Sequence, residues 1–276
     1  MVAPPVQDWP QAQRNMAVGK YCGWIACFIL QSYSIFGRMY RPMDISHIPS
    51  YEDMIKAGMH FGRKKTIFHP NMKSFVYGAK EHIYLLDLIR TSDALTKAID
   101  FMSQNLSEGK TILFVGVTKP SHDPVKAAAE SLGMPYVTER WLGGTLTNFK
   151  VIIARVKYLE DLEREQTSGG FDKYTKKEKL LKEREMEALR KKYDGLRKLT
   201  KLPDVVFVSS LKESQLAVRE AKVMKIPVVA IVNTDSDPKQ VAMAIPANDN
   251  ARKSVELILE AITRSCQSIP SKNSEI

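Results

Sequence analysis

Three short runs of apolar residues restrict the possible folds of this 276-residue chain more than any other feature. They cover residues 111–117, 204–208 and 227–232, and turn-forming residues bound each of them. Such runs, without polar alternation, are typical of strands that are buried on both faces of a parallel sheet. Segments with helical spacing of apolar residues lie between them, so the chain is predicted to form a parallel sheet with helices on both faces.

Shorter segments complete the predicted sheet. Residues 82–87 are expected to be its first strand, 135–138 its third and 241–246 its last. The helix that follows the first strand is expected at residues 92–106, where apolar residues recur at spacings of three and four. The basic segment before the first strand, residues 60–65, is expected to be an extended loop.

Capping residues predict where two helices begin. Ser50 is the expected N-cap of a short helix over residues 50–56. Asp123 followed by Pro124 predicts a second helix start, because aspartate is favoured as an N-cap and proline at the first helical position. Gly133 is expected to end that helix in a left-handed conformation.

Two further helix starts are predicted in the second half of the chain. Ser210 and Glu213 have the spacing of a capping box and predict a helix that runs to about residue 225. Asp237 before Pro238 predicts a short helix ahead of the last strand.

A highly charged stretch interrupts the alternation between the third and fourth predicted strands. Residues 147–166 have apolar positions on one side of a helix, and a capping box from Thr175 to Glu178 predicts the start of a second helix. Two helices joined by about eight residues predict an antiparallel helical hairpin, a coiled coil that buries only its seam. Sixteen basic and ten acidic residues lie between Lys150 and Lys201, and this surplus suits an arm that crosses phosphates.

The expected organisation is one α/β domain with an insertion and two flanking segments. Residues 43–146 and 202–264 would form the α/β domain, 147–201 the hairpin insertion and 265–276 a polar tail. Residues 1–42, with a ten-residue apolar run, are expected to be an extension outside the fold, from a mis-set start or as a true extension. An organellar presequence and a membrane anchor are the alternatives for this segment.

Charge and cysteine content narrow the class of partner. Lysine and arginine number 41 against 31 aspartate and glutamate, a formal net charge of +10, which favours nucleic acid first and an anionic membrane surface second. Cys22, Cys27 and Cys266 have no metal-ligand spacing and are expected to be free thiols. His60 and His69 have no cysteine or carboxylate beside them, so no metal site is predicted there.

A Rossmann-like enzyme that binds a sugar phosphate or a nucleotide is the alternative function. Ligands of such sheets bind beyond the carboxyl ends of the strands, yet the chain has no glycine-rich phosphate loop there. Asp235 and Asp237 offer oxygen ligands for a divalent ion, but Asp237 is also the expected helix cap. We therefore predict a protein without catalysis and without a cofactor.

Basic residues interleaved with aromatic ones suit contacts with RNA phosphates and bases. Trp141, beside a pair of glycines, is assigned instead to packing. The predicted RNA contacts fall into two groups along the chain, a first loop and the region of the glycine pair with the base of the hairpin. They are Arg63, Lys64, Lys65, His69 and Lys73, then Arg140, Lys150 and Arg155.

Three motifs in order resemble the small-subunit ribosomal protein S2 family, over residues 50–263. They are residues 57–62 with 69–73, residues 140–149 (Arg-Trp-Leu-Gly-Gly-Thr-Leu-Thr-Asn-Phe), and residues 203–208 with 226–238. The family usually has His where Arg63 stands, and Asp, Gly or Asn where Ser210 stands. Both changes keep the expected roles, because arginine can still donate hydrogen bonds to RNA and serine can still act as a helix N-cap.

The resemblance implies a fold and a role. The fold is a flavodoxin-like or Rossmann-like sheet with an inserted helical hairpin. The role is that of a structural constituent of the small ribosomal subunit, which contacts rRNA between head and body, joins late in assembly and performs no chemistry. Its implied partners are small-subunit rRNA and neighbouring ribosomal proteins, among them ribosomal protein S1, with no membrane. The implied location is the bacterial cytoplasmic ribosome, with a mitochondrial or plastid ribosome as the alternative.

Overall fold

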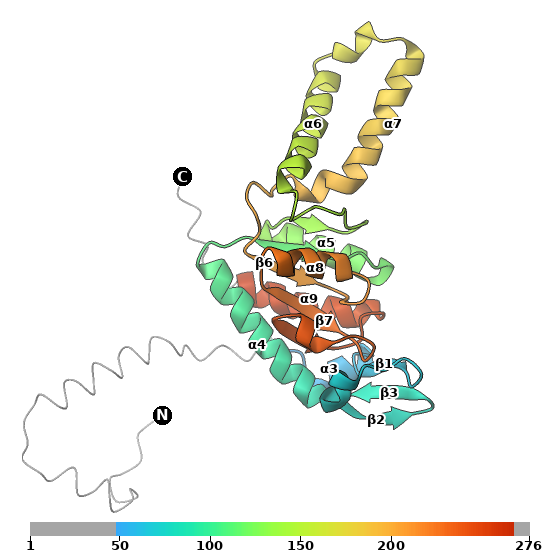
Figure 1. Ribbon diagram of the computed structural model, residues 1–276, viewed down its shortest axis with the longest axis vertical. Coiled ribbons are helices and arrows are strands. Elements are labelled where there is room, and N and C mark those ends of the chain that lie inside the picture. Colours follow the sequence, from blue (N-terminus) through green and yellow to red (C-terminus); the bar gives the residue numbers. More distant parts are fainter. Residues whose placement is uncertain (1–47, 268–276) are drawn as a thin grey trace, which may run out of the picture. The chain divides into compact units, whose positions relative to one another are not determined.

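The three apolar runs are neighbouring strands of a parallel sheet in the computed structural model, which describes residues 48–267 (Figure 1). They form β4 (Ile112–Val115), β6 (Val205–Val208) and β7 (Val228–Val232), and every residue in them is buried. The two-residue β5 (Tyr136–Val137) and β8 (Met243–Pro246) complete the order β5-β4-β6-β7-β8, with all pairs parallel. The prediction of a doubly covered parallel sheet is confirmed.

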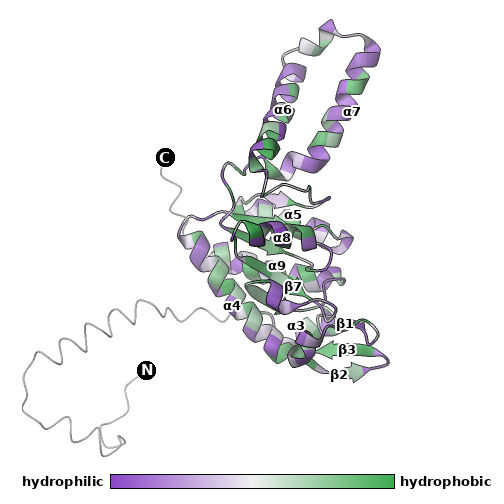
Figure 2. Ribbon diagram, viewed as in Figure 1, coloured by the Kyte–Doolittle hydropathy of each residue, from purple (hydrophilic) through white to green (hydrophobic). Residues whose placement is uncertain are grey.

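Alternating side chains of the strands divide the core into two layers. On one face, Phe114 and Phe207 pack among residues of α4 (Leu88–Ser107), α5 (Lys119–Leu132) and α9 (Arg252–Gln267). On the other face, Val115 and Val208 pack against α8 (Gln215–Val223) and the first turns of α6 (Phe149–Thr167). The sequence order reverses between β4 and β6, which is the order of flavodoxin-like folds. Figure 2 shows the apolar colouring concentrated on this sheet.

The predicted first strand is not part of this sheet. Its residues form β3 (Ile83–Leu86), which lies between β1 (Phe61–Lys64) and β2 (Val76–Lys80) in a separate antiparallel sheet of order β1-β3-β2. The basic segment expected as a loop is therefore strand β1. A 3-10 helix, η3 (Pro70–Phe75), joins β1 to β2.

A two-residue turn explains why this small sheet was missed. Glu81 and His82 join β2 to β3 and have φ values of 47° and 66°. Left-handed angles at both positions are what a type I′ hairpin turn requires, and asparagine or glycine usually supplies them. Neither asparagine nor glycine stands at these two positions, so the sequence contains no ordinary hairpin signal.

Two predicted helix starts are wrong by several residues. Helix α4 begins at Leu88 instead of residue 92, because the Asp87 carboxylate caps it by accepting from the Ile89 N–H at 3.0 Å. Helix α5 begins at Lys119, after Thr118, with a proline already in its first turn. Pro124 therefore lies inside the helix, while Gly133 ends it with φ 68° as predicted.

The predicted capping box at Ser210 is also wrong. Helix α8 begins five residues later, at Gln215, and the Ser210 hydroxyl instead donates to Asp249 at 2.7 Å. By contrast, Asp237 caps η6 (Pro238–Gln240) by accepting from the Lys239 N–H at 3.1 Å, as predicted.

The ends of the described region follow the sequence closely. Helix α3 (Tyr51–Lys56) begins after Ser50, whose hydroxyl accepts from the Asp53 N–H at 3.2 Å. Helix α9 continues to Gln267, so the tail expected from residue 265 begins later; Cys266 is a buried free thiol. The expected extension, residues 1–42, and its two cysteines lie outside the described residues. From residue 48 to residue 267, no helix has the length and hydropathy that crossing a membrane requires.

The predicted hairpin consists of α6 and α7 (Lys176–Tyr193), which lie side by side (Figure 1). The capping box of Thr175 and Glu178 starts α7 as predicted, after η4 (Gly170–Lys173). Leu162, Phe171 and Met186 form a small buried cluster between the helices. The two helices are also joined by ion pairs, Arg190 with Glu163 and Lys182 with Glu165. Coiled-coil packing stays a prediction.

One carboxylate links both helices of the hairpin to the segment that follows them. Glu163 on α6 accepts from Arg190 on α7 at 2.6 Å and from Arg197 at 2.7 and 2.9 Å. These guanidinium donors lower the pKa of Glu163 from 4.5 to about 2. A lowered pKa means that the pair stabilises the fold above pH 4.5 and that this contribution is lost as the pH falls toward 2.

We expect Glu163→Gln to destabilise the protein by about 1–2 kcal/mol at pH 7, since charge-assisted bonds are lost at a partly screened site. The difference from wild type should shrink as the pH falls from 5 to 2. Urea unfolding followed by circular dichroism across this range measures it. Glu187→Gln, an exposed position on α7, is the control. A difference that does not change with pH would contradict the role of the Glu163 charge.

The chain that leaves the hairpin covers the edge of the parallel sheet. Strand β5 is the edge strand, and η5 (Asp194–Leu196) packs on it. A Cβ on Gly195 would lie 2.6 and 2.8 Å from the ring carbons Cδ2 and Cε2 of Tyr136 and would also meet the Tyr136 carbonyl oxygen. Only glycine allows this approach, which closes an edge that would otherwise stay open to pairing with another strand.

Candidate nucleic-acid interface

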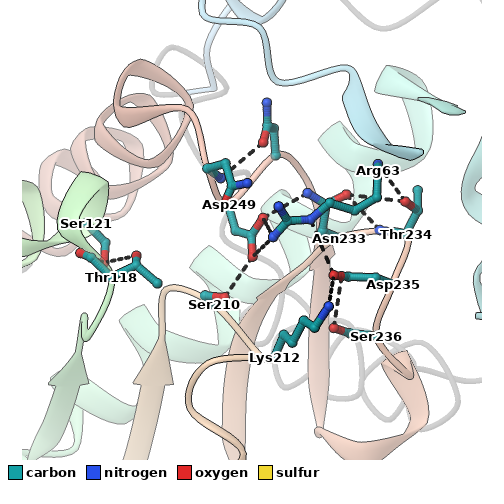
Figure 3. A network of polar contacts seen from close by, with 12 residues as sticks. Arg63, Thr118, Ser121, Ser210, Lys212, Asn233, Thr234, Asp235, Ser236 and Asp249 are labelled. Carbon is teal, nitrogen blue, oxygen red and sulfur yellow. Dashed lines mark hydrogen bonds and ion pairs between the residues drawn. The ribbon is translucent and has the colours of Figure 1, made fainter. Parts of the chain in front are cut away.

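A network of buried polar side chains fills the carboxyl ends of β6, β7 and β8 (Figure 3). At its centre the Arg63 guanidinium lies 3.3 Å from Asp235, which follows β7, and 3.1 Å from Asp249, which follows β8. The Asp235 and Asp249 side chains are 0% and 2% exposed, and Arg63 is 23% exposed. Buried carboxylates need such partners, because an unpaired charge away from water is costly.

The remaining acceptor positions of the two carboxylates are also used. Asp249 accepts from Ser210 at 2.7 Å and from the Asn233 amide at 2.8 Å. Asp235 accepts from the Lys212 ammonium at 2.9 Å. Open α/β sheets bind their ligands beyond the carboxyl ends of the strands, at the point where the strand order reverses, which here lies between β4 and β6. The network lies beside that point, where the chain's own side chains occupy the carboxyl ends of β6, β7 and β8.

The predicted cap role of Asp237 is confirmed, whereas a divalent-ion site at Asp235 and Asp237 gains no support from this geometry. Asp235 is already paired with Arg63 and Lys212, and Asp237 accepts from Asn71 at 2.9 Å besides capping η6. Within residues 48–267, no three His, Cys, Asp or Glu side chains are grouped so that they could hold a metal ion. Two cavities, of about 270 Å³ between α5 and α9 and about 120 Å³ at the hairpin base, both lie outside this network.

The network joins the antiparallel sheet to the parallel one. The Arg63 N–H donates to the Thr234 hydroxyl at 2.8 Å, and the His69 N–H donates to the Thr234 carbonyl at 2.9 Å. A Cβ on Gly62 would lie 2.7 Å from Cγ2 of Thr234, so the two backbones approach closely. Arg63 was predicted to contact RNA phosphates; its guanidinium pairs with two internal carboxylates, and the RNA contact stays a prediction.

The lysines after Arg63 are exposed and gain two basic neighbours. Lys64 pairs in register with Ile83, as does Lys80 on the other side of β3, and the Lys65 N–H donates to the His82 carbonyl at 2.9 Å. The exposed residues Lys64, Lys65, Lys80 and His82, which we call the basic end, therefore lie together at one end of the antiparallel sheet. Sequence reasoning missed Lys80 and His82 because it missed the hairpin that brings them there.

The other two predicted contacts of the first group lie on η3. His69 is the N-cap of η3; its Nδ1 accepts from the Asn71 N–H at 3.3 Å and its side chain is half-buried. Lys73 is exposed in the last turn of η3, just before β2.

The second predicted group surrounds the glycine pair. Arg140, Lys150 and Arg155 are exposed, at the start of the loop and on the first turns of α6. Trp141 is 6% exposed and packs in the core beneath, as predicted. This group follows the edge strand β5, whereas Arg63 bonds to residues beyond β7 and β8 near the opposite edge. The predicted residues therefore form two separate patches.

A buried carboxylate, missed by sequence reasoning, determines the shape of this loop. Glu220 on α8 accepts from the Trp141 indole at 3.1 Å and from the N–H groups of Gly144 at 2.8 Å and Leu146 at 3.0 Å. Burial alone would raise the pKa of Glu220, but these donors lower it below its ordinary value. Gly144 has φ 90°, a left-handed angle suited to glycine, so the loop needs both the glycine and the carboxylate.

Comparisons with known proteins agree with the motifs. Residues 54–268 match the family model described as ribosomal protein S2. The chain is 40% identical over 213 residues to small ribosomal subunit protein uS2 of Shewanella piezotolerans, covering 77% of this chain and 88% of the relative. It is also 40% identical to the proteins of the same name from Hahella chejuensis (218 residues, 79% and 86%) and Coprothermobacter proteolyticus (215 residues, 78% and 80%).

Proposed function

Since the chain belongs to the ribosomal protein S2 family and is a structural constituent of the small ribosomal subunit, we propose that it binds the subunit's rRNA through two patches of exposed basic residues. The family match over residues 54–268 carries the proposal. The first patch is the basic end with Lys73, and the second is Arg140, Lys150 and Arg155.

The proposed mechanism is binding without chemistry. Lysine and arginine neutralise phosphates and release condensed counterions, so the affinity should fall steeply with salt concentration. The side chains that occupy the carboxyl ends of β6, β7 and β8 support this role over the alternative of a sugar-phosphate or nucleotide enzyme. Arg63 and His69 serve in it as positioning residues, because they fix β1 and η3 against Thr234 while the neighbouring lysines stay exposed.

The relatives guide the finer assignments. We assign the partners as rRNA and neighbouring small-subunit proteins, with ribosomal protein S1 as a candidate among them. The three relatives come from bacteria, which favours the bacterial cytoplasmic ribosome over an organellar one. We assign residues 43–146, and residues 202 to the end of α9 at Gln267, to the α/β domain, with residues 147–201 as its insertion.

We expect Lys64→Glu and Lys65→Glu each to weaken binding to small subunits that lack this protein, by roughly tenfold at low salt. The slope of log affinity against log salt should flatten by roughly one per lost phosphate contact. Melting temperatures should stay near the wild-type value, because exposed substitutions change stability by only about 0.5 kcal/mol or less. Filter binding at several salt concentrations provides the measurement.

Lys97→Glu is the matched control for these variants. Lys97 is exposed on α4 and belongs to neither patch. Its substitution by glutamate changes the net charge by the same amount as Lys64→Glu does. If Lys97→Glu weakened binding as much as Lys64→Glu, the effect would come from total charge and the first patch would lose its assignment.

A sucrose gradient of a tagged copy in its own cells tests the function as a whole. We expect co-sedimentation with the small subunit that weakens at high salt. A protein that stayed at the top of the gradient at every salt concentration would reject the ribosomal role and favour the enzyme alternative.

A further inference from the structure

Tyr77 is the most exposed large apolar side chain among the described residues. The residue is 81% exposed, compared with 51% for Tyr51 and 45% for Phe61. It belongs to β2, an outer strand of the antiparallel sheet, which neighbours β3 on one side only (Figure 1). A large aromatic ring held in water on an ordered strand is a candidate contact surface.

The register of β2 shows how this exposure arises. Val76 pairs with Leu86, and Gly78 pairs with the adjacent Leu85, so two steps along β2 match one step along β3. Tyr77 is therefore the extra residue of a β-bulge. A bulge turns the local strand and redirects the side chain it carries, and bulges are frequent beside functional sites.

Exposed lysines lie on both sides of Tyr77 along the chain. Lys80, three residues further on, lies roughly 10 Å along the strand and belongs to the basic end. Lys73 is exposed just before the strand. By contrast, exposed Tyr51 has Glu52 and Asp53 beside it.

We propose that Tyr77 is a stacking platform for one unpaired base of the rRNA, with Lys73 and Lys80 holding the phosphates of the same strand. Every base offers a flat face to an aromatic ring, whereas the cations require a negatively charged partner. A protein partner would account for the exposed ring but not for the lysines beside it. The positive charges of these lysines favour RNA, whose backbone is negatively charged. The proposal rests on the proposed function and adds that the RNA at this point is single-stranded, because a base within a helix cannot reach the ring.

Binding of variants to small subunits that lack this protein tests the proposal. Tyr77→Ala should weaken binding by roughly 5- to 100-fold, the range found for the loss of one stacked base. Tyr77→Phe and Tyr77→Trp should bind within a few-fold of wild type, because they keep an aromatic face. Tyr77→Leu should resemble Tyr77→Ala, because it keeps apolar area without a ring. Tyr51→Ala is the control and should bind as wild type does.

Cross-linking of the wild-type complex at 254 nm, followed by mass spectrometry, identifies the neighbour of the ring. The expected product is a nucleotide joined to the peptide that contains Tyr77. Unchanged affinity of Tyr77→Ala would overturn the proposal. The proposal would also be overturned if Tyr77→Ala weakened binding while Tyr77→Leu bound as wild type does, or if the ring cross-linked to a protein. Either result would assign the ring to a protein contact. If wild-type protein did not bind these subunits at all, the proposed function itself would fail.

Discussion

Gly195→Ala should lower the stability of the protein by about 3 kcal/mol, at the upper end of the usual cost of inserting a methyl group into a packed site. The new Cβ would meet the carbonyl oxygen and the ring of Tyr136, and a backbone atom cannot move aside as a flexible side chain can. For a chain of this size the melting temperature should fall by roughly 6–12 °C. Thermal unfolding followed by circular dichroism measures the change.

Gly78→Ala is the matched control for this substitution. Nothing lies within 4 Å of the position of its Cβ, and its φ is not in the left-handed range. We therefore expect a change of about 0.5 kcal/mol or less there. Equal melting temperatures for the two variants would show that η5 does not press on β5 as described.

Glu220→Gln should destabilise the fold by about 2–4 kcal/mol, because the buried amide nitrogen of glutamine would face N–H donors that now bond to a carboxylate oxygen. Trp141, Gly144 and Leu146 all donate to this one side chain. The loop that carries Arg140 would lose its shape, so rRNA binding should weaken together with stability. Urea unfolding measures the first effect, and binding to small subunits that lack the protein measures the second.

Glu213→Gln makes the same change at an exposed position shortly before α8, and it should leave both quantities near wild type. If Glu220→Gln unfolded at the same urea concentration as Glu213→Gln, the loop would owe its shape to the glycine pair and to packing alone.

The parallel sheet could be predicted because its signal is local. The residues of β4, β6 and β7 are apolar without interruption, and burial on both faces requires this pattern wherever the strands pair. Asp237 and Thr175 were also predicted correctly, because each caps a helix that begins at the next residue.

The errors arose where a distant partner competed with a local preference. Ser210 has the spacing of a cap, but a buried carboxylate 39 residues away takes its hydroxyl. Arg63 resembles a surface cation, but Asp249 lies 186 residues further along the chain. Glu220 has no local signal at all, since its loop lies 74–79 residues earlier. Lys80 and His82 were missed because the turn that brings them beside Lys64 and Lys65 lacks the residues that usually mark a hairpin.

The position of the hairpin has a consequence for the order of folding. Strands β4 and β6 are neighbours, and the Thr111 N–H donates to Asp204, 93 residues further along the chain. Closing so long a loop costs conformational entropy and slows folding. Helices α6 and α7 form from local contacts, and residues at both ends of the hairpin, Ile152 and Leu196, join the same core layer. Once the two helices pair, the two ends of the hairpin are already close together. The insertion therefore shortens the loop that must close before β6 can pair with β4.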